Sequence, residues 1–143
     1  MSELQLRFAH GGLEIVLSRS GNVGTMAWRG SSDSRNPGDF LDSVFRRALE
    51  HAQGGELVID FTALEFMNSS TVSPIVAFLK DANAKRLQCR VVFSDVDWQR
   101  THMRCLRAIT RVLSYISVDC RPARTTSESS SRIATNHQRL FYN

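Results

Sequence analysis

The sequence predicts an α/β fold in which strands and helices alternate along the chain. A β-type apolar run at residues 57–61 precedes a segment whose apolar residues recur at helical spacing. A second apolar run, residues 89–93, precedes another such segment. The N-terminal part carries two β-type runs joined by a Ser-Gly-Asn turn, which is typical of a hairpin. Because alternating strands and helices connect by right-handed crossovers, the sheet should be largely parallel.

Length and composition indicate one folded domain. The chain has 143 residues, of which 42% are hydrophobic and 22% charged, as in ordinary globular proteins. It contains no run of about 18 apolar residues, so we expect no membrane span. The N-terminal residues do not resemble a signal peptide. Cys89, Cys105 and Cys120 are odd in number and widely spaced, which fits neither a disulfide framework nor a zinc site. We therefore expect a cytoplasmic protein.

The first forty residues are expected to form β-structure. Alternating apolar residues at 4–8 indicate a short strand or a frayed arm. Residues 13–17 and 23–28 are the two arms of the hairpin, since Gly and Asn in the intervening turn tolerate positive φ. Residues 30–38 are rich in Gly, Ser and Asn and read as a loop.

Three helices alternate with the remaining strands. The first is expected over residues 39–53, with Asp39 as its N-cap and Gly54-Gly55 ending it. The apolar run 57–61 suits a central strand covered on both faces, and the second helix ends near Lys85. The third helix follows strand 89–93, is capped by Asp95 or Asp97, and runs to about residue 113.

The C-terminal part of the chain loses this periodicity. Residues 115–118 are expected to form a last short edge strand, which ends the domain at residue 118. Residues 119–143 are rich in Ser, Thr and Arg without a periodic pattern, so we predict a disordered tail. We keep two alternatives for its last apolar residues, a free end or a docked one, and favour the free end.

Hydroxyl side chains gather where the strand at 57–61 leads into the second helix. Ser69 and Ser70 lie near the N-terminus of that helix, where backbone donors and the helix dipole favour an anion. Pro74 disfavours helical backbone geometry at the residue before it, and proline is most favourable at the first position of a helix. Ser73 is therefore one candidate N-cap, with Ser69 to Val72 in an exposed loop; alternatively Ser70 starts the first turn. We favour Ser73.

The segment Phe-Met-Asn-Ser-Ser at residues 66–70, between a strand and an amphipathic helix, resembles the signature of STAS domains. These include bacterial anti-sigma-factor antagonists. The resemblance extends from about residue 13 to residue 118. The family loop usually reads Asp-Ser-Ser-Gly or Asp-Ser-Thr-Gly, whereas Asn68 and Thr71 stand at the outer positions here. A group of bacterial STAS-like proteins has Asn in the loop and a Trp-Gln pair like Trp98-Gln99.

The resemblance implies a small mixed, mostly parallel sheet with helices packed mainly on one face. It also implies a non-enzymatic signalling regulator that binds a partner through the loop and second helix. The phospho-acceptor would be Ser70 or Ser69, and the partner-binding residues would be Asn68, Ser69, Ser70, Thr71 and Ser73. The partner would be a serine kinase or ATPase of the anti-sigma type, with a PP2C-type phosphatase removing the phosphate.

Other features leave alternatives open. A constitutive scaffold or small-ligand sensor on the same fold needs no phosphorylation. The basic residues Arg100, Arg104, Arg107 and Arg111 share one helical side, which indicates a solvated face or a surface for an acidic partner. We expect no nucleic-acid binding, because no aromatic stacking motif accompanies the charge.

Single residues near the loop have structural interpretations. Asp60 is expected to bond loop amides at the end of its strand, a metal role being the less favoured alternative. Trp98 is expected to pack in the core or as a staple of the third helix, with an interface anchor as the alternative. The isolated histidines show no metal-ligand spacing, and no nucleophile or phosphate-loop motif occurs. We therefore expect neither an enzyme nor a cofactor.

Overall fold

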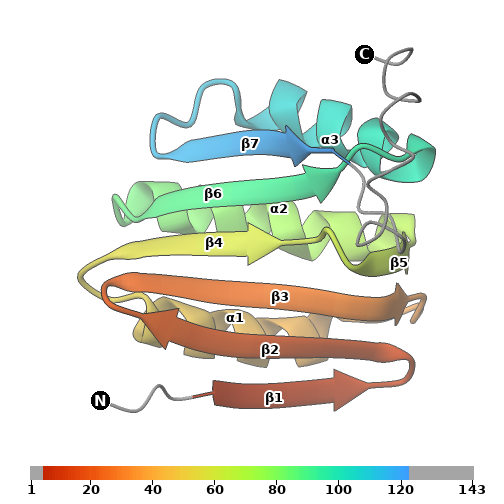
Figure 1. Cartoon of the computed structure of the whole chain (residues 1–143), viewed down its shortest axis with the longest axis horizontal. Helices are drawn as coiled ribbons and strands as arrows, with labels where there is room; N and C mark the ends of the chain where they lie inside the picture. The colour runs from red at the N-terminus through yellow and green to blue at the C-terminus, as the bar shows by residue number, and fades with distance from the viewer. Residues whose placement is uncertain (1–4, 123–143) are drawn as a thin grey trace, which may run out of the picture.

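The computed structural model describes residues 5–122, which form one seven-stranded sheet and three helices. Figure 1 shows the three helices behind the sheet, so they all cover the same face of it and, within residues 5–122, no helix covers the other face. The elements in chain order are β1 (Gln5–His10), β2 (Leu13–Ser20), β3 (Val23–Ser32), α1 (Gly38–His51), β4 (Glu56–Asp60), β5 (Leu64–Met67), α2 (Ser69–Ala84), β6 (Gln88–Ser94), α3 (Asp97–Thr110) and β7 (Ile116–Arg121).

The sheet is mixed, with an antiparallel hairpin region and a parallel half. Its spatial order is β1-β2-β3-β4-β6-β7, and β5 pairs with the end of β3. Strands β1, β2 and β3 are antiparallel neighbours, whereas β3, β4, β6 and β7 run parallel. Along the chain, each helix connects two strands that run parallel, because parallel strands need crossover connections. The predicted α/β fold with helices mainly on one face is therefore confirmed.

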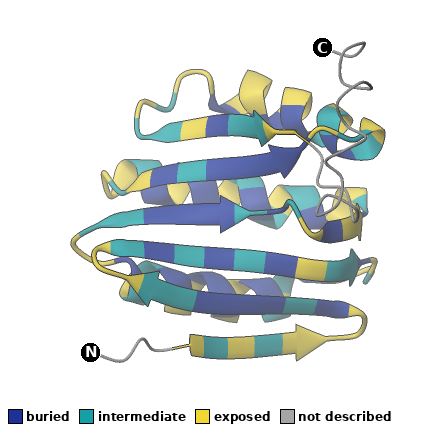
Figure 2. Cartoon of the chain, viewed as in Figure 1, coloured by how far each residue is buried: buried dark blue, intermediate teal, exposed yellow. Residues whose placement is uncertain are grey.

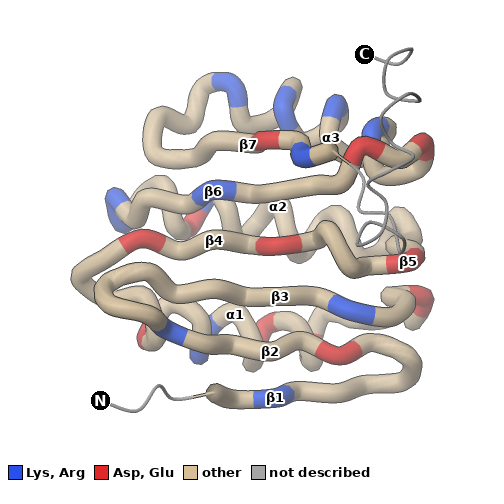
Figure 3. The backbone as a smooth tube through the Cα atoms, viewed as in Figure 1, with Lys and Arg blue, Asp and Glu red and all other residues tan. Residues whose placement is uncertain are grey.

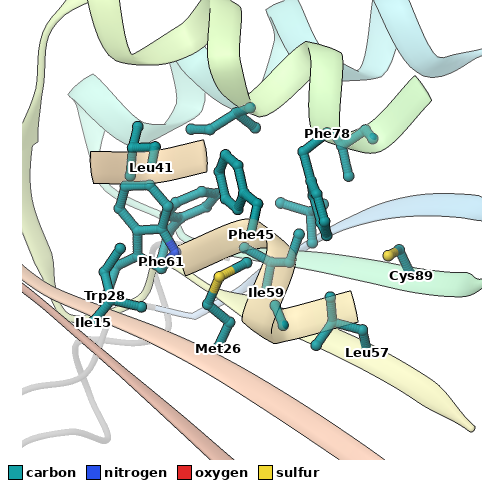
Figure 4. Packing of buried hydrophobic residues seen from close by; sticks show 14 of the residues in the cluster. Ile15, Met26, Trp28, Leu41, Phe45, Leu57, Ile59, Phe61, Phe78 and Cys89 are labelled. Carbon is teal, nitrogen blue, oxygen red and sulfur yellow. The ribbon is translucent and has the colours of Figure 1, made fainter. Parts of the chain in front are cut away.

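The hydrophobic core lies between the sheet and the helices. Buried residues concentrate on the central strands β2, β4 and β6 and on the inner faces of the helices (Figure 2). The ring of Phe61 packs edge-on against Trp28 and stacks on Phe93, with centroid distances of 5.0 Å in both pairs. Phe45 of α1 stacks on Phe78 of α2 at 4.5 Å, and both rings are visible in Figure 4. Each such pair adds about 1 kcal/mol beyond area burial.

The segment expected to be a connection after β4 contains a strand, β5, and β3 is longer than predicted. Gly30 has φ +85°, and the pairing of β3 with β5 shifts register between Gly30 and Ser31. This irregularity turns Ser31 and Ser32 toward β5, against Phe66 and Met67. The loop predicted at residues 30–38 is thus wrong at its start, because a bulge continues the strand through it.

The ends of α1 and α3 also differ from the predictions. Asp39 is not the N-cap of α1, since the helix begins at Gly38 after Pro37 and Asp39 lies in the first turn. Neither Asp95 nor Asp97 caps α3: Val96 holds that position, and both carboxylates bind the guanidinium of Arg100 instead. An acidic residue in the first turn still favours the helix through the dipole.

The outer strands settle two further predictions. Residues 5–10 form a full strand paired with β2 rather than a frayed arm. The expected edge strand forms as β7, but it extends to Arg121, past the domain end placed at residue 118. Beyond Pro122, the predicted disordered tail and its apolar end lie outside the described residues.

Candidate functional site at the N-terminus of helix α2

Helix α2 begins at Ser69, immediately after Asn68, which is its N-cap. The side-chain oxygen of Asn68 accepts hydrogen bonds from the Thr71 backbone N–H at 3.1 Å and the Thr71 hydroxyl at 2.7 Å. The favoured prediction of Ser73 as N-cap is therefore wrong, and a helix starting in the Ser70 turn is nearer to the structure. An asparagine oxygen reaching the third helical N–H is a strong cap, and the helix begins there although Pro74 removes one helical hydrogen bond further along.

A buried hydrogen-bond network fixes this helix end to strand β3. The Ser32 and Thr71 hydroxyls lie 2.7 Å apart, and both side chains are almost fully buried. The Asn68 side-chain amide donates to the Ser34 carbonyl at 2.9 Å, and the Asn68 backbone N–H donates to the Ser32 carbonyl at 3.0 Å. Thr71 was predicted to contact the partner. Because it is buried, it shapes the site from beneath and offers no contact surface.

Three serines at this helix end are exposed: Ser69, Ser70 and Ser73. The buried stripe of α2 includes Thr71, Ile75 and Phe78, which fixes the rotation of the helix. With about 100° between successive residues, Ser69 and Ser73 point away from the sheet. Ser70 lies on the flank that continues through Pro74, one turn later. The structure thus brings all three serines to one helix end, with Ser70 on a different side of it.

The electrostatics of this helix end favour an added negative charge. The first turn of α2 contains no acidic residue, so the positive end of its dipole is not compensated there. The first N–H groups of a helix have no intrahelical acceptor, and Asn68 occupies that of Thr71. Pro74 has no N–H and cannot bond the Ser70 carbonyl. Among the described residues, the backbone N–H groups of Ser69 and Ser70 therefore have no helical acceptor.

An exposed aromatic residue, Phe66, lies beside this site and was not assigned to it from the sequence. Its residue surface is 46% exposed, which is unusual for a phenylalanine on a strand. It lies on β5, two residues before the cap Asn68, so it is only a few residues from the exposed serines. The sequence gives no signal for this exposure, because a strand of four residues shows no readable alternation.

Gln99 is a second residue whose role the sequence did not show. Its side chain is 1% exposed, accepts from the Ser94 N–H at 2.7 Å, and donates to the carbonyls of Phe61 at 2.9 Å and Leu64 at 3.0 Å. It therefore fixes the connection between β4 and β5 that leads to the site. Asp60 at the same connection accepts from the backbone N–H and hydroxyl of Thr62, which confirms its predicted bonding to the loop.

Basic residues recur along α3, away from the start of α2 (Figure 3). Arg100 is held by Asp95 and Asp97, whose carboxylates raise its pKa. Arg107 donates from Nε to the Val118 carbonyl at 3.1 Å, which ties α3 to β7. Arg104 and Arg111 are exposed, so the series is divided between structural contacts and solvent.

Trp98 and the cysteines have structural surroundings. Trp98 is partly buried against the core, as predicted. Burial raises the pKa of the Cys89 thiol to about 12, which keeps it protonated and unreactive near neutral pH. Within residues 5–122, His, Cys, Asp and Glu side chains form no group of three suited to a metal ion. No helix in this range has the length and apolar character needed to cross a membrane.

Replacing Asn68 with alanine is expected to lower the free energy of unfolding by about 1–2 kcal/mol. The change removes the cap on Thr71 and the bond to the Ser34 carbonyl. Asn68→Ser is the matched variant, since a serine hydroxyl can keep the cap while the donor to the Ser34 carbonyl is lost. It should therefore lose less stability than Asn68→Ala in urea unfolding, and equal stability of Asn68→Ala and the unaltered chain would contradict this role.

The chain belongs to the STAS domain family, whose profile matches residues 14–121. That range runs from β2 through β7 and includes the site at α2. A solved structure similar to this chain is the complex of the diguanylate cyclase SiaD with its activator SiaC from Pseudomonas aeruginosa. The match has a TM-score of 0.56 and 12% identity, and it covers 81% of this chain and 99% of the other. At this identity the likeness shows the fold. No curated protein matches the sequence.

Proposed function

We propose that this STAS domain is a non-catalytic cytoplasmic regulator that binds a protein partner through the N-terminal end of α2. The observation that supports this proposal most directly is that Ser69, Ser70 and Ser73 are exposed at a helix end held by Asn68. The STAS family and the structural likeness to a chain in an enzyme–activator complex support partner binding. The proposed partner is a serine kinase or ATPase of the anti-sigma type.

The proposed switch is phosphorylation of Ser70, with Ser69 as the second candidate acceptor. A phosphoryl group adds about −1.5 to −2 charge and three acceptor oxygens. The uncompensated helix end can accept this charge without unfolding, because its free N–H groups and dipole favour anions. The phosphate then occupies the helix N–H groups that a carboxylate of the partner would otherwise bind. It also repels that carboxylate. A PP2C-type phosphatase would restore binding.

Phe66 extends the proposed surface beyond the serines. A half-exposed aromatic ring beside a rigid polar helix end has the composition of an interface anchor. Asn68 is half-buried, so it contributes an edge to this surface while holding the helix. Thr71 is not part of the contact surface in this proposal.

The alternative is a scaffold or small-ligand sensor that binds without phosphorylation. It is favoured by Asn68 and Thr71, which differ from the usual family loop and are both used in the structural network. In that case the serines would serve only as surface residues of the first helical turn.

Mass spectrometry after incubation with a co-encoded kinase is expected to locate one phosphate on Ser70. Ser70→Ala should abolish that modification and Ser69→Ala should leave it, because only the former removes the acceptor. A known substrate of the same kinase serves as the control for activity. Absence of phosphate from both serines while the control is modified would contradict the switch and favour the alternative.

A further inference from the structure

A groove with an apolar floor runs between α1 and α2, and its first lining residue on α2 is Pro74, about one helical turn after Ser70. It has a volume of about 440 Å³. Its floor is the stacked pair Phe45 and Phe78, labelled in Figure 4. Both rings are only 5% exposed, so the floor is narrow and well packed. The lining residues are Asp42, Phe45, Arg46, Leu49, Pro74, Ala77, Phe78, Asp81 and Lys85.

The walls of the groove are two helical stripes. Asp42, Phe45, Arg46 and Leu49 follow the spacing i, i+3, i+4 and i+7 on α1. On α2 the stripe formed by Pro74, Ala77 and Asp81 continues backward by one turn to Ser70. From Pro74 to Lys85 the groove is about 16 Å long, at about 1.5 Å per residue, which matches three turns of a docked helix.

The charges on the walls indicate what would fit. Lys85 and Asp81 pair with each other at 2.7 Å. Asp42 and Arg46 form no ion pair with another described residue, although they stand one turn apart above the apolar floor. A helix that places apolar side chains over Phe45 and Phe78 would satisfy both charges with one acidic and one basic residue, also one turn apart.

We infer that this groove receives an amphipathic helix of the partner protein, with an acidic residue facing Arg46 and a basic residue facing Asp42. This inference rests on the proposed function, because it names the surface that the partner uses beyond the α2 tip. It also distinguishes the two candidate acceptors. Ser70 stands at the head of the groove, whereas Ser69 points away from it, so a phosphate on Ser70 would obstruct the docked helix.

The test is photo-crosslinking in the native host with p-benzoylphenylalanine at Ala77 in the groove, Ser73 at the helix tip, and Ala108 on α3. All three positions are exposed, so the probe should not disturb folding. We expect the same protein to be captured from Ala77 and Ser73 but not from Ala108. Its cross-linked peptide should have apolar residues at i, i+3 or i+4. Capture from Ser73 alone, or capture of a second copy of this chain from Ala77, overturns the groove while partner binding at the tip stands.

Reversing a charge in the groove provides a second test, in which the affinity for the captured protein is measured. Arg46→Glu is expected to weaken its binding about tenfold, because it places like charges against each other. Arg104→Glu is the matched control, since Arg104 is exposed on α3, does not line the groove, and its reversal is expected to leave affinity unchanged. Equal affinity of both variants overturns the inference. Loss of capture at every position instead overturns the proposed function itself.

Discussion

Replacing Gln99 with leucine is expected to lower the free energy of unfolding by about 3 kcal/mol. The side chain is buried and makes three hydrogen bonds to backbone groups of β6 and the β4–β5 connection. Leucine has a similar size but removes all three bonds. The Phe61 carbonyl still accepts from the Leu64 N–H at 3.0 Å, so the loss falls mainly on the Ser94 N–H and the Leu64 carbonyl. Each buried group left unpaired costs about 1–3 kcal/mol, partly offset by the added apolar contact.

The matched control is Arg104→Leu, on the same helix but exposed. It should change stability by no more than about 0.5 kcal/mol. Urea unfolding followed by circular dichroism measures both variants under the same conditions. If Gln99→Leu unfolds at the same urea concentration as Arg104→Leu, the three hydrogen bonds do not stabilise the fold as inferred.

Gly30→Ala is expected to destabilise the protein by about 3 kcal/mol or more. Gly30 has φ +85°, a conformation that alanine adopts only with strain of about 1–2 kcal/mol. An added Cβ would also overlap the carbonyl oxygen of Gly12. Because both obstacles are backbone, the strand pairing itself must shift. The shift would reach Ser32, which follows Gly30 on β3 and holds Thr71 beneath α2.

Gly21→Ala separates the two causes. Gly21 also has positive φ, at +64°, but an added Cβ there meets nothing within 4 Å. It should therefore cost only the conformational strain, about 1–2 kcal/mol. Thermal unfolding compares the two variants. Equal losses of stability in the two variants would mean that the overlap with Gly12 is relieved easily and that the bulge is not rigid.

Much of the fold could be predicted because its signals are local. The apolar runs at β4 and β6, the Ser-Gly-Asn turn at residues 20–22, and the helical spacing after Ser70 each depend on neighbouring residues. The strand β5 could not be predicted, since it has four residues and its pairing depends on a register shift at Gly30. Such a shift is set by the close approach of distant backbone, which no periodicity records.

The candidate site was predicted in part. Its position at the start of α2 follows from the apolar run and the serines. The preference of proline for the first helical position favours Ser73 as the cap, whereas Asn68 caps the helix and Pro74 lies inside it. Asparagine is as good a cap as serine, and Asn68 also reaches the Ser34 carbonyl, a contact across 34 residues of chain. Burial of Thr71 and Gln99 likewise depends on tertiary packing, which overrides the usual exposure of polar residues.

The most direct measurement of the central claim is the affinity of the partner for the Ser70→Asp and Ser70→Ala variants, by isothermal titration calorimetry. We predict at least about tenfold weaker binding for Ser70→Asp, a difference of about 1.4 kcal/mol, and unchanged binding for Ser70→Ala. The aspartate places a negative charge and a larger side chain in the first turn of α2, whereas alanine removes only a hydroxyl. Equal affinities for the two variants would contradict a phosphorylation switch at this helix end.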